Sequence, residues 1–154
     1  MEKIAIFPGS FDPFTKGHES IVNRALPLFD KIIIAIGYNS NKDGFFPLEK
    51  RMGWIKDVFK NEPKIVVEAY QGLTVDFCNR MKAKYILRGL RTAADFEYER
   101  AIAQTNKMLA KHIESVFLLT TPELTPINST IVRDIVRNGG DASMFVPDAV
   151  DLKK

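Results

Sequence analysis

Five short runs of apolar residues recur along the chain, separated by more polar stretches. They lie at residues 4–7, 31–37, 64–70, 85–90 and 115–120 and are rich in isoleucine and valine. Within each run, successive residues are apolar, which is typical of strands buried on both faces of a parallel sheet. The pattern therefore predicts five buried parallel strands.

Helical patterns lie between and after these strands, in the ranges 18–29, 47–60, 73–82, 94–113 and 129–140. The order is thus β-α repeated five times. Parallel strands joined by right-handed crossovers predict a doubly wound, Rossmann-like α/β fold with helices on both faces of the sheet. We expect one domain over residues 1–154, because domains commonly span about 100–150 residues. Ligands should bind at the carboxyl ends of the strands.

Composition excludes a few classes of protein. Hydrophobic residues make up 45% of the chain, and the net charge is only +3. This small basic excess suits an anionic small molecule as well as nucleic acid, and no aromatic-basic RNA motif is present, so we expect no nucleic-acid partner. The one cysteine, Cys78, excludes an internal disulfide, lies in an apolar run and is interpreted as a packing residue. A single cysteine fits a reduced, cytoplasmic setting. No apolar run approaches the ~20 residues of a membrane helix, so we expect no membrane partner.

The segment FPGSFDPFTKGH, at residues 7–18, is the first candidate site because it leaves the first strand at its carboxyl end. Gly9 would let the chain turn and a ligand approach the backbone. Ser10 offers a hydroxyl group, and His18 falls at the start of a helix, where unpaired amides favour a phosphate. The alternative is a turn whose histidine only caps the helix. The density of special residues favours the site.

Two arginines form a second candidate site. Arg88 and Arg91 lie at the carboxyl end of the fourth predicted strand. Two guanidinium groups at this end could bind phosphate through several charge-assisted hydrogen bonds. The alternative is a pair of surface arginines bridged to Asp95, Glu97 or Glu99. Their position after a buried strand favours phosphate binding.

These segments carry a resemblance to known enzymes. Residues 15–18, TKGH, resemble the TxGH signature of the nucleotidyltransferase superfamily, whereas the two common Gly-rich nucleotide motifs are absent. RGLR followed by DFEYE, within residues 85–99, closely resembles bacterial phosphopantetheine adenylyltransferases. So do PGSFDPFTKGH, the lysine in the 38–46 loop and INST at 127–130. These matches are ordered as in that family and extend over residues 3 to about 147.

The resemblance implies a reaction. Members of the family transfer the adenylyl group of ATP to 4′-phosphopantetheine, giving dephospho-coenzyme A and pyrophosphate, in the penultimate step of coenzyme A biosynthesis. The acceptor phosphate attacks directly in line, with no covalent enzyme intermediate, so positioning and charge stabilisation should supply most of the catalysis. The resemblance also implies Mg²⁺ held mainly by the ATP phosphates, with no protein residue named as a metal ligand. It further implies a homohexamer and possible inhibition by coenzyme A.

The resemblance assigns roles to individual residues. The implied catalytic residues are His18, Lys42, Arg88 and Arg91, with His18 stabilising the transition state. The implied phosphopantetheine-binding residues are Ser10, Lys42, Thr74 and Arg88. The implied ATP-binding residues are Ser10, Phe11, His18, Gly89, Leu90, Arg91, Glu99, Leu124, Thr125, Pro126, Ile127, Asn128, Ser129 and Thr130.

Several of these residues have simpler interpretations. Lys42 lies in a polar loop and could be only solvated. Ser129 and Thr130 could be only helix caps. Asn128 stands where the family usually has serine, which leaves its role open. Glu99 could be a surface residue of its helix.

Two residues outside the motifs are interpreted as structural. His112 follows a lysine in a helical pattern and is expected at the surface. Trp54 is expected to pack rather than to stack on a base.

Two other functions remain open. One is another small nucleotidyltransferase, such as a cytidylyltransferase or a nicotinamide mononucleotide adenylyltransferase, against which RGLR with DFEYE argues. The other is a nucleotide- or coenzyme A-binding module without turnover, against which the presence of both His18 and Arg91 argues.

Overall fold

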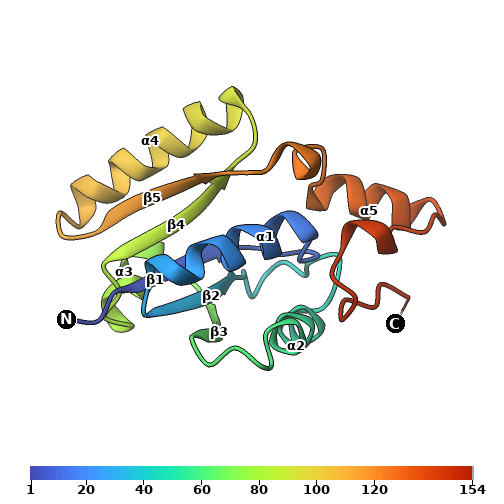
Figure 1. Ribbon diagram of the computed structural model, residues 1–154, viewed down its shortest axis with the longest axis horizontal. Helices are drawn as coiled ribbons and strands as arrows, with labels where there is room; N and C mark the ends of the chain where they lie inside the picture. Colours follow the sequence, from blue (N-terminus) through green and yellow to red (C-terminus); the bar gives the residue numbers. More distant parts are fainter. Residues whose placement is uncertain (154) are drawn as a thin grey trace.

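A computed structural model describes residues 1–153, which form a five-stranded parallel sheet in the order β3-β2-β1-β4-β5 (Figure 1). The strands are β1 (Ile4–Gly9), β2 (Lys31–Gly37), β3 (Ile65–Tyr70), β4 (Tyr85–Leu90) and β5 (Glu114–Leu119). The predicted Rossmann-like α/β fold is confirmed. That the whole range 1–154 is one domain stays a prediction, and Lys154 lies outside the described residues.

A helix follows each strand. The helices are α1 (Lys16–Ala25), α2 (Leu48–Val58), α3 (Thr74–Arg80), α4 (Ala93–Leu109) and α5 (Ser129–Arg137). All five are shorter than the predicted ranges, and for two of them a local reason is clear. The α-helical part of α1 ends at Ala25 because Pro27 lies in the 3-10 turn that follows. Helix α5 ends at Arg137, before Gly139, whose φ of 79° is not helical.

The core lies on both faces of the central strands. On one face, Phe7 of β1 packs with residues of α1 and α2, and on the other face Ile6 packs with residues of α3. The prediction that the strands are buried on both faces holds for β1 and β2. It is wrong for β3 and β5, whose side chains are mostly only partly buried, because these two strands form the edges of the sheet.

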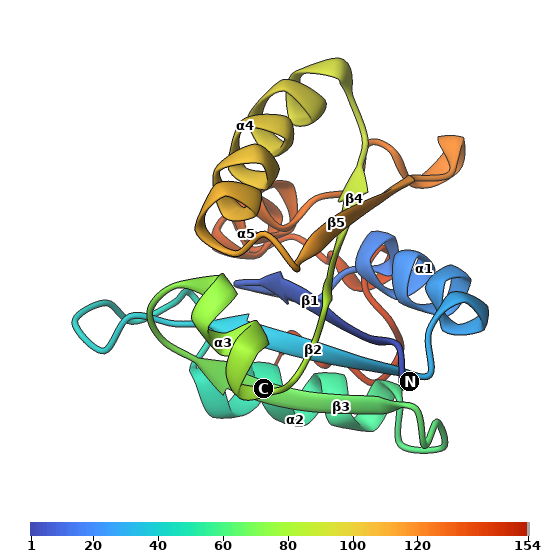
Figure 2. The same ribbon diagram turned by 90° about the vertical axis from the view of Figure 1, so that its left-hand side faces the viewer.

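The two ends of the sheet are covered differently. Helix α4 lies over β4 and β5 at one end, whereas α2 lies beside β3 at the other (Figure 2). The segment after α5 returns to α2, where Val146 and Val150 form a small cluster with Trp54 and Phe46. Trp54 is buried against the Phe46 ring, with 5.1 Å between the ring centroids, which confirms its packing role.

Two other observations bear on the sequence predictions. Cys78 is completely buried in the core, as expected for a packing residue. Among the helices of residues 1–153, none is both long enough and apolar enough to cross a membrane.

Candidate active site

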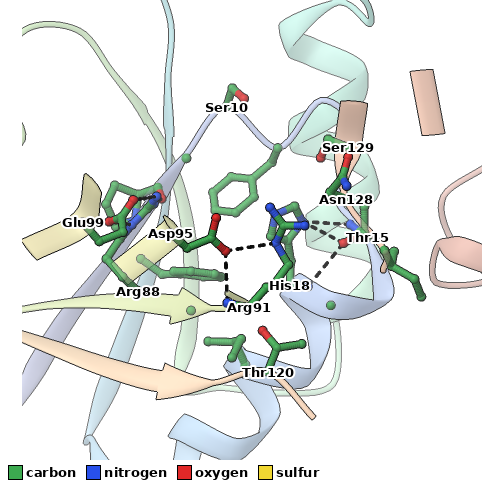
Figure 3. Close-up of a pocket in the computed structure, with 18 residues that line it drawn as sticks. Ser10, Thr15, His18, Arg88, Arg91, Asp95, Glu99, Thr120, Asn128 and Ser129 are labelled. Carbon is green, nitrogen blue, oxygen red and sulfur yellow. Dashed lines mark hydrogen bonds and ion pairs between the residues drawn. The ribbon is translucent and has the colours of Figure 1, made fainter. Parts of the chain in front are cut away.

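A cavity of about 270 Å³ opens at the carboxyl ends of β1 and β4 (Figure 3). The chain leaves β1 toward β2 on one side, and β4 lies on the other side, so the strand order reverses here. A doubly wound sheet is expected to bind ligands at this position. Ten of the predicted site residues line the cavity: Ser10, Phe11, His18, Arg88, Gly89, Arg91, Glu99, Ile127, Asn128 and Ser129.

The other predicted residues lie elsewhere. The predicted ATP-binding residues outside the cavity lining are Leu90, Leu124, Thr125, Pro126 and Thr130. Leu90 is buried, and its carbonyl oxygen accepts a hydrogen bond from the Thr120 N–H at 2.8 Å. Thr120 lines the cavity instead, as do Thr15 and Asp95, none of which the sequence marked as a ligand.

His18 is fixed by its own helix. Thr15 is the N-cap of α1 and has an extended backbone, so its side-chain oxygen accepts a hydrogen bond from the His18 N–H. In return, the Thr15 N–H donates to Nδ1 of His18 at 2.9 Å. The interpretation of His18 as a capping residue is therefore confirmed, and it coexists with a place in the cavity wall.

This capping arrangement determines which nitrogen of the His18 ring carries the proton. Because Nδ1 accepts a hydrogen bond, a neutral His18 ring carries its proton on Nε2. Burial, together with the smaller effect of the positive charges of Arg88 and Arg91, lowers the pKa of His18 from 6.5 to about 3. At neutral pH the ring is thus uncharged and offers an Nε2–H donor.

Aromatic side chains surround this imidazole. The Phe11 ring lies edge-on to it, with centroids 5.0 Å apart, and the Phe14 ring lies 5.3 Å away. Phe11 has a φ of 47°, an uncommon value for a bulky residue. A Cβ atom on Gly9 would lie 2.9 Å from the Phe11 ring. Gly9 therefore makes room for Phe11, rather than only for a ligand as the sequence suggested.

Arg88 is held by three of its five N–H donors. Its Nε and Nη2 donate to the two carboxylate oxygens of Glu99 at 2.7 and 2.9 Å, and its Nη1 donates to the Pro8 carbonyl oxygen. Glu99 is buried, at 7% exposure, so it is not a surface residue. The ion pairing that the sequence left as an alternative is present, and it holds the Arg88 guanidinium in one orientation at the cavity wall.

Arg91 is held more loosely. Its side chain forms an ion pair with Asp95 at 3.3 Å, whereas the Arg88 side chain makes three shorter hydrogen bonds. The Arg91 N–H also donates to the Asp95 carboxylate at 3.0 Å. The Asp95 N–H in turn donates to Thr92, the N-cap of α4. Arg91 therefore has more freedom than Arg88 to turn toward a ligand.

A second cavity, of about 230 Å³, lies on the other side of Arg88 and Glu99, which line both cavities together with Pro8 and Gly9. Its wall also includes apolar residues such as Ile102 and Phe117. Thr74, predicted to bind phosphopantetheine, lies here, and its hydroxyl is hydrogen-bonded to the Tyr70 hydroxyl at 2.8 Å. The fold thus brings Thr74 close to Arg88.

The start of α5 differs from its predicted form. Asn128 is the N-cap, because its backbone is extended and its side-chain oxygen accepts from the Ile131 N–H at 2.9 Å. The prediction of hydroxyl caps at Ser129 and Thr130 is wrong, since both residues already lie inside the helix. Ser129 instead donates its hydroxyl to the Pro13 carbonyl oxygen at 2.8 Å. The usual serine position at 128 is thus occupied by another good capping residue.

Among the predicted catalytic residues, Lys42 is the one that lies outside both cavities. It lies in an exposed loop. Its N–H donates to the Asn39 carbonyl oxygen at 3.0 Å, which closes a tight turn. His112 is exposed, as expected, and its Nε2 is hydrogen-bonded to the side chain of Asn79.

Acidic side chains at the site are committed to arginines. The two that line the first cavity, Asp95 and Glu99, pair with Arg91 and Arg88. Across residues 1–153, no group of three or more histidine, cysteine, aspartate or glutamate side chains is placed to hold a metal ion.

The sequence analysis also missed a buried charged pair behind the site, Asp12 and Arg51. A signal for Arg51 was present in the sequence. It lies four and eight residues before Ile55 and Phe59, which places it on the apolar face of its helix. An arginine in that position needs a buried partner.

The sequence matches one family model and several named proteins. A family model described as cytidylyltransferase-like matches residues 6–135. A phosphopantetheine adenylyltransferase of Flavobacterium psychrophilum is 57% identical over 149 residues, which are 97% of this chain and 98% of that protein. Proteins of the same name from Bacteroides fragilis and Leptospira biflexa are 50% and 48% identical and cover 96% and 97% of this chain, and 98% and 94% of their own length.

Solved structures share the fold. A bifunctional NMN adenylyltransferase/ADP ribose pyrophosphatase from Francisella tularensis, complexed with AMP and Mn ion, matches with a TM-score of 0.71 at 20% identity. The match covers 95% of this chain but only 44% of that one, so this chain spans less than half of the bifunctional protein. At this identity the likeness concerns the fold alone.

Proposed function

The chain belongs to the phosphopantetheine adenylyltransferases, within the cytidylyltransferase-like nucleotidyltransferases, and from this membership we infer how its own residues serve the reaction. It is an enzyme of coenzyme A biosynthesis that transfers the adenylyl group of ATP to 4′-phosphopantetheine. One observation carries this conclusion, the 57% identity that extends over nearly the full length of both chains. It confirms the family that the motifs indicated.

We propose that ATP binds in the first cavity. Arg91 would turn from Asp95 to a phosphate, and the Nε2–H of His18 would donate to another phosphate oxygen. The N-terminal turns of α1 and α5 both line the cavity, and exposed helix amides favour phosphate groups there. Residues 124–130 would contribute mainly through Ile127, Asn128 and Ser129, which are the members of that segment in the cavity lining.

The second cavity is proposed to receive the acceptor. Its apolar wall suits the pantetheine arm, and Arg88 at the junction would hold the acceptor phosphate beside the α-phosphate of ATP. Thr74 would contact the same substrate. Lys42 would have to approach from its loop, since it lines neither cavity. The junction is thus where the two phosphate groups would meet.

The proposed chemical step is a direct displacement. An acceptor phosphate oxygen forms a bond to the α-phosphorus, while the bond from that phosphorus to the bridging oxygen breaks and its electrons leave with pyrophosphate. A phosphate nucleophile needs no general base, so a histidine that stays neutral is suited to the task. Its Nε2–H would stabilise the charge that develops on the α-phosphate oxygens.

Magnesium is proposed as the cofactor, bound to ATP. Mg²⁺ usually keeps several waters and binds through substrate phosphates with few carboxylate ligands. The pairing of Asp95 and Glu99 with arginines agrees with that mode of binding. The metal would neutralise part of the triphosphate charge, and no protein residue is assigned to it.

A homohexamer is also proposed, with an interface that includes α4. Only Glu99 is buried among the residues of this helix, whereas Phe96, Tyr98, Ile102 and Met108 expose between 39% and 81% of their surface. Such a patch on a soluble enzyme indicates a contact with another chain. Sedimentation would give the number of copies, and a monomer in solution would contradict this proposal.

The remaining partners are proposed from the family. Dephospho-coenzyme A would leave as product and coenzyme A could inhibit by occupying the same cavities. The enzyme would work in the cytoplasm, without a nucleic-acid or membrane partner.

The direct test follows pyrophosphate release from ATP and Mg²⁺ with 4′-phosphopantetheine. Nicotinamide mononucleotide with ATP, and glycerol 3-phosphate with CTP, serve as control pairs. Release with phosphopantetheine alone is the expected result. Release with a control pair would favour another nucleotidyltransferase, and ATP binding without any release would favour a binding module.

A further inference from the structure

A buried charged pair lies behind the active site, between two loops. Asp12, in the loop after β1, is 7% exposed, and Arg51, in α2, is 5% exposed. Neither residue lines either cavity, so neither can touch a ligand bound there. Their role must therefore act through the loops that they contact.

The Asp12 carboxylate binds the end of the loop that carries Lys42. One carboxylate oxygen accepts from the Phe45 N–H at 2.7 Å, and the other accepts from the Phe46 N–H at 2.8 Å. Both oxygens are thus used by consecutive backbone amides. Charge-assisted hydrogen bonds of this kind are stronger than neutral ones.

The Arg51 guanidinium contacts both loops at once. Its Nη1 donates to the Ser10 carbonyl oxygen at 2.8 Å, and its Nε donates to the Phe46 carbonyl oxygen at 2.9 Å. The same Nε lies 3.9 Å from the Asp12 carboxylate. A planar group with several fixed donors can span two carbonyl oxygens in this way, whereas a lysine cannot.

Gly44 shows how closely these groups approach the loop. A Cβ atom at this position would lie 2.9 Å from both the Arg51 guanidinium and the Asp12 carboxylate. On the other side of the loop after β1, Arg133 of α5 donates to the Asp12 carbonyl oxygen at 2.8 Å. Three separate segments are therefore tied together around Asp12.

Stability alone does not account for the pair. Replacing a buried ion pair with well-packed apolar side chains is often neutral or stabilising, so such pairs are weak contributors to folding. Here every hydrogen bond of the two side chains goes to the backbone of the loops next to Ser10 and Lys42. What the pair does is fix the distance between those loops.

We propose that Asp12 and Arg51 are positioning residues that hold the Ser10 backbone and the base of the Lys42 loop in the geometry that binds the acceptor phosphate. The proposal rests on the proposed function, with Ser10 and Lys42 contacting the acceptor phosphate as the family resemblance implies; Ser10 lines the first cavity next to the junction with the second. The first cavity owes its shape to other elements as well, so ATP binding depends less on the pair.

The test compares Arg51→Met, Arg51→Lys and Asp12→Asn with the wild-type enzyme. Lys56→Met is the control, because Lys56 is an exposed basic residue on the same helix. Arg51→Met should raise the KM for phosphopantetheine about 10- to 100-fold, since a small misplacement of binding groups can cost that much. The KM for ATP should stay near the wild-type value. Arg51→Lys should show nearly the same increase in the KM for phosphopantetheine, although it keeps the positive charge.

A second measurement does not depend on activity. Hydrogen exchange at the Phe45 and Phe46 amides should be faster in Asp12→Asn than in the wild type, because the charged acceptor is lost. This substitution conserves shape, so it remains informative where Arg51→Met does not fold.

The outcomes separate the two proposals. Equal increases in both KM values, or a lower melting temperature with unchanged KM values, would overturn the positioning role, as would unchanged exchange at the two amides. A wild-type enzyme inactive with phosphopantetheine would instead overturn the proposed function, while the exchange experiment would still judge the pair.

Discussion

The loops after β1 and β2 begin at the same edge of the sheet, yet they are held in opposite ways. Residues 11–15, after β1, are all buried, whereas residues 38–45, after β2, are all exposed. Both loops lead to a side chain expected to meet a phosphate, His18 in one case and Lys42 in the other. The His18 ring is held by a hydrogen bond at Nδ1 and by the neighbouring Phe11 and Phe14 rings. Lys42 is held through its backbone N–H.

This difference separates two kinds of contribution to catalysis. A donor that is already in place costs no reorganisation when charge develops, so it acts mainly on the transition state. A flexible lysine must be ordered by the ligand, which weakens its net contribution to binding. We therefore expect His18 to control kcat and Lys42 to control the affinity for the acceptor.

The largest effect is expected from His18→Ala. Removing one preorganised donor typically lowers kcat by about 10²–10³-fold, and the KM for ATP should change much less. His112→Ala is the matched control, because His112 is exposed and lines neither cavity. Steady-state kinetics at saturating substrates gives the answer. A His18→Ala enzyme with normal kcat would remove the distinction between the two loops.

Arg88→Met is expected to affect both substrates, because Arg88 lines both cavities. It also leaves the buried Glu99 carboxylate without its partner, which should cost about 3–5 kcal/mol of folding free energy. Adding Glu99→Gln to this variant should recover part of that stability but none of the activity. Denaturant unfolding and kinetics of the two single variants and the double variant measure both effects. Recovered activity in the double variant would show that Arg88 does not bind phosphate.

Lys42→Ala is expected to have a smaller effect, mostly on the KM for phosphopantetheine. Loss of a hydrogen bond to a charged group costs about 1.5–3 kcal/mol, which is roughly a 10- to 100-fold change, and the exposed loop places Lys42 at the low end of that range. Lys60→Ala, also exposed, is the control. A fall in kcat as large as that of His18→Ala would mean that the two loops are equally organised.

The pH dependence of stability should show that His18 stays neutral in the folded protein. The pKa of His18 is lowered from 6.5 to about 3 in the folded protein. Between these values the unfolded chain binds more protons, so stability falls as pH decreases through 6.5 toward 3. Replacing His18 with asparagine should remove this part of the slope. Unfolding of both proteins at several pH values measures the difference, and identical slopes would contradict the assigned pKa shift.

Much of the fold could be predicted from local patterns. The apolar runs located all five strands, and the β-α alternation predicted a parallel sheet with its ligand edge. RGLR, DFEYE and TKGH marked residues that the fold does bring together, including His18, Arg88 and Arg91. These features depend on neighbouring residues, and the order of elements then constrains where they meet.

Other features depend on partners far apart in the sequence. In the sequence, 38 residues lie between Asp12 and Arg51, and no local pattern indicates that the two form a pair. From the sequence, pairing of Arg88 with Glu99 and binding of phosphate by Arg88 were alternatives. Only the folded geometry shows that the paired arginine still lines both cavities. The cap at Asn128 was missed because the backbone conformation, rather than residue preference, decides where a helix starts.

The central claim is that the donor on His18 is set before substrate arrives. Nitrogen NMR of the histidine side chains in the substrate-free enzyme tests it directly, with His112→Gln used to assign the two rings. The account predicts a neutral His18 ring near pH 7, with the proton on Nε2 and Nδ1 unprotonated, and no titration of that ring as the pH falls through 6.5. A proton on Nδ1, or a titration near 6.5, would contradict it.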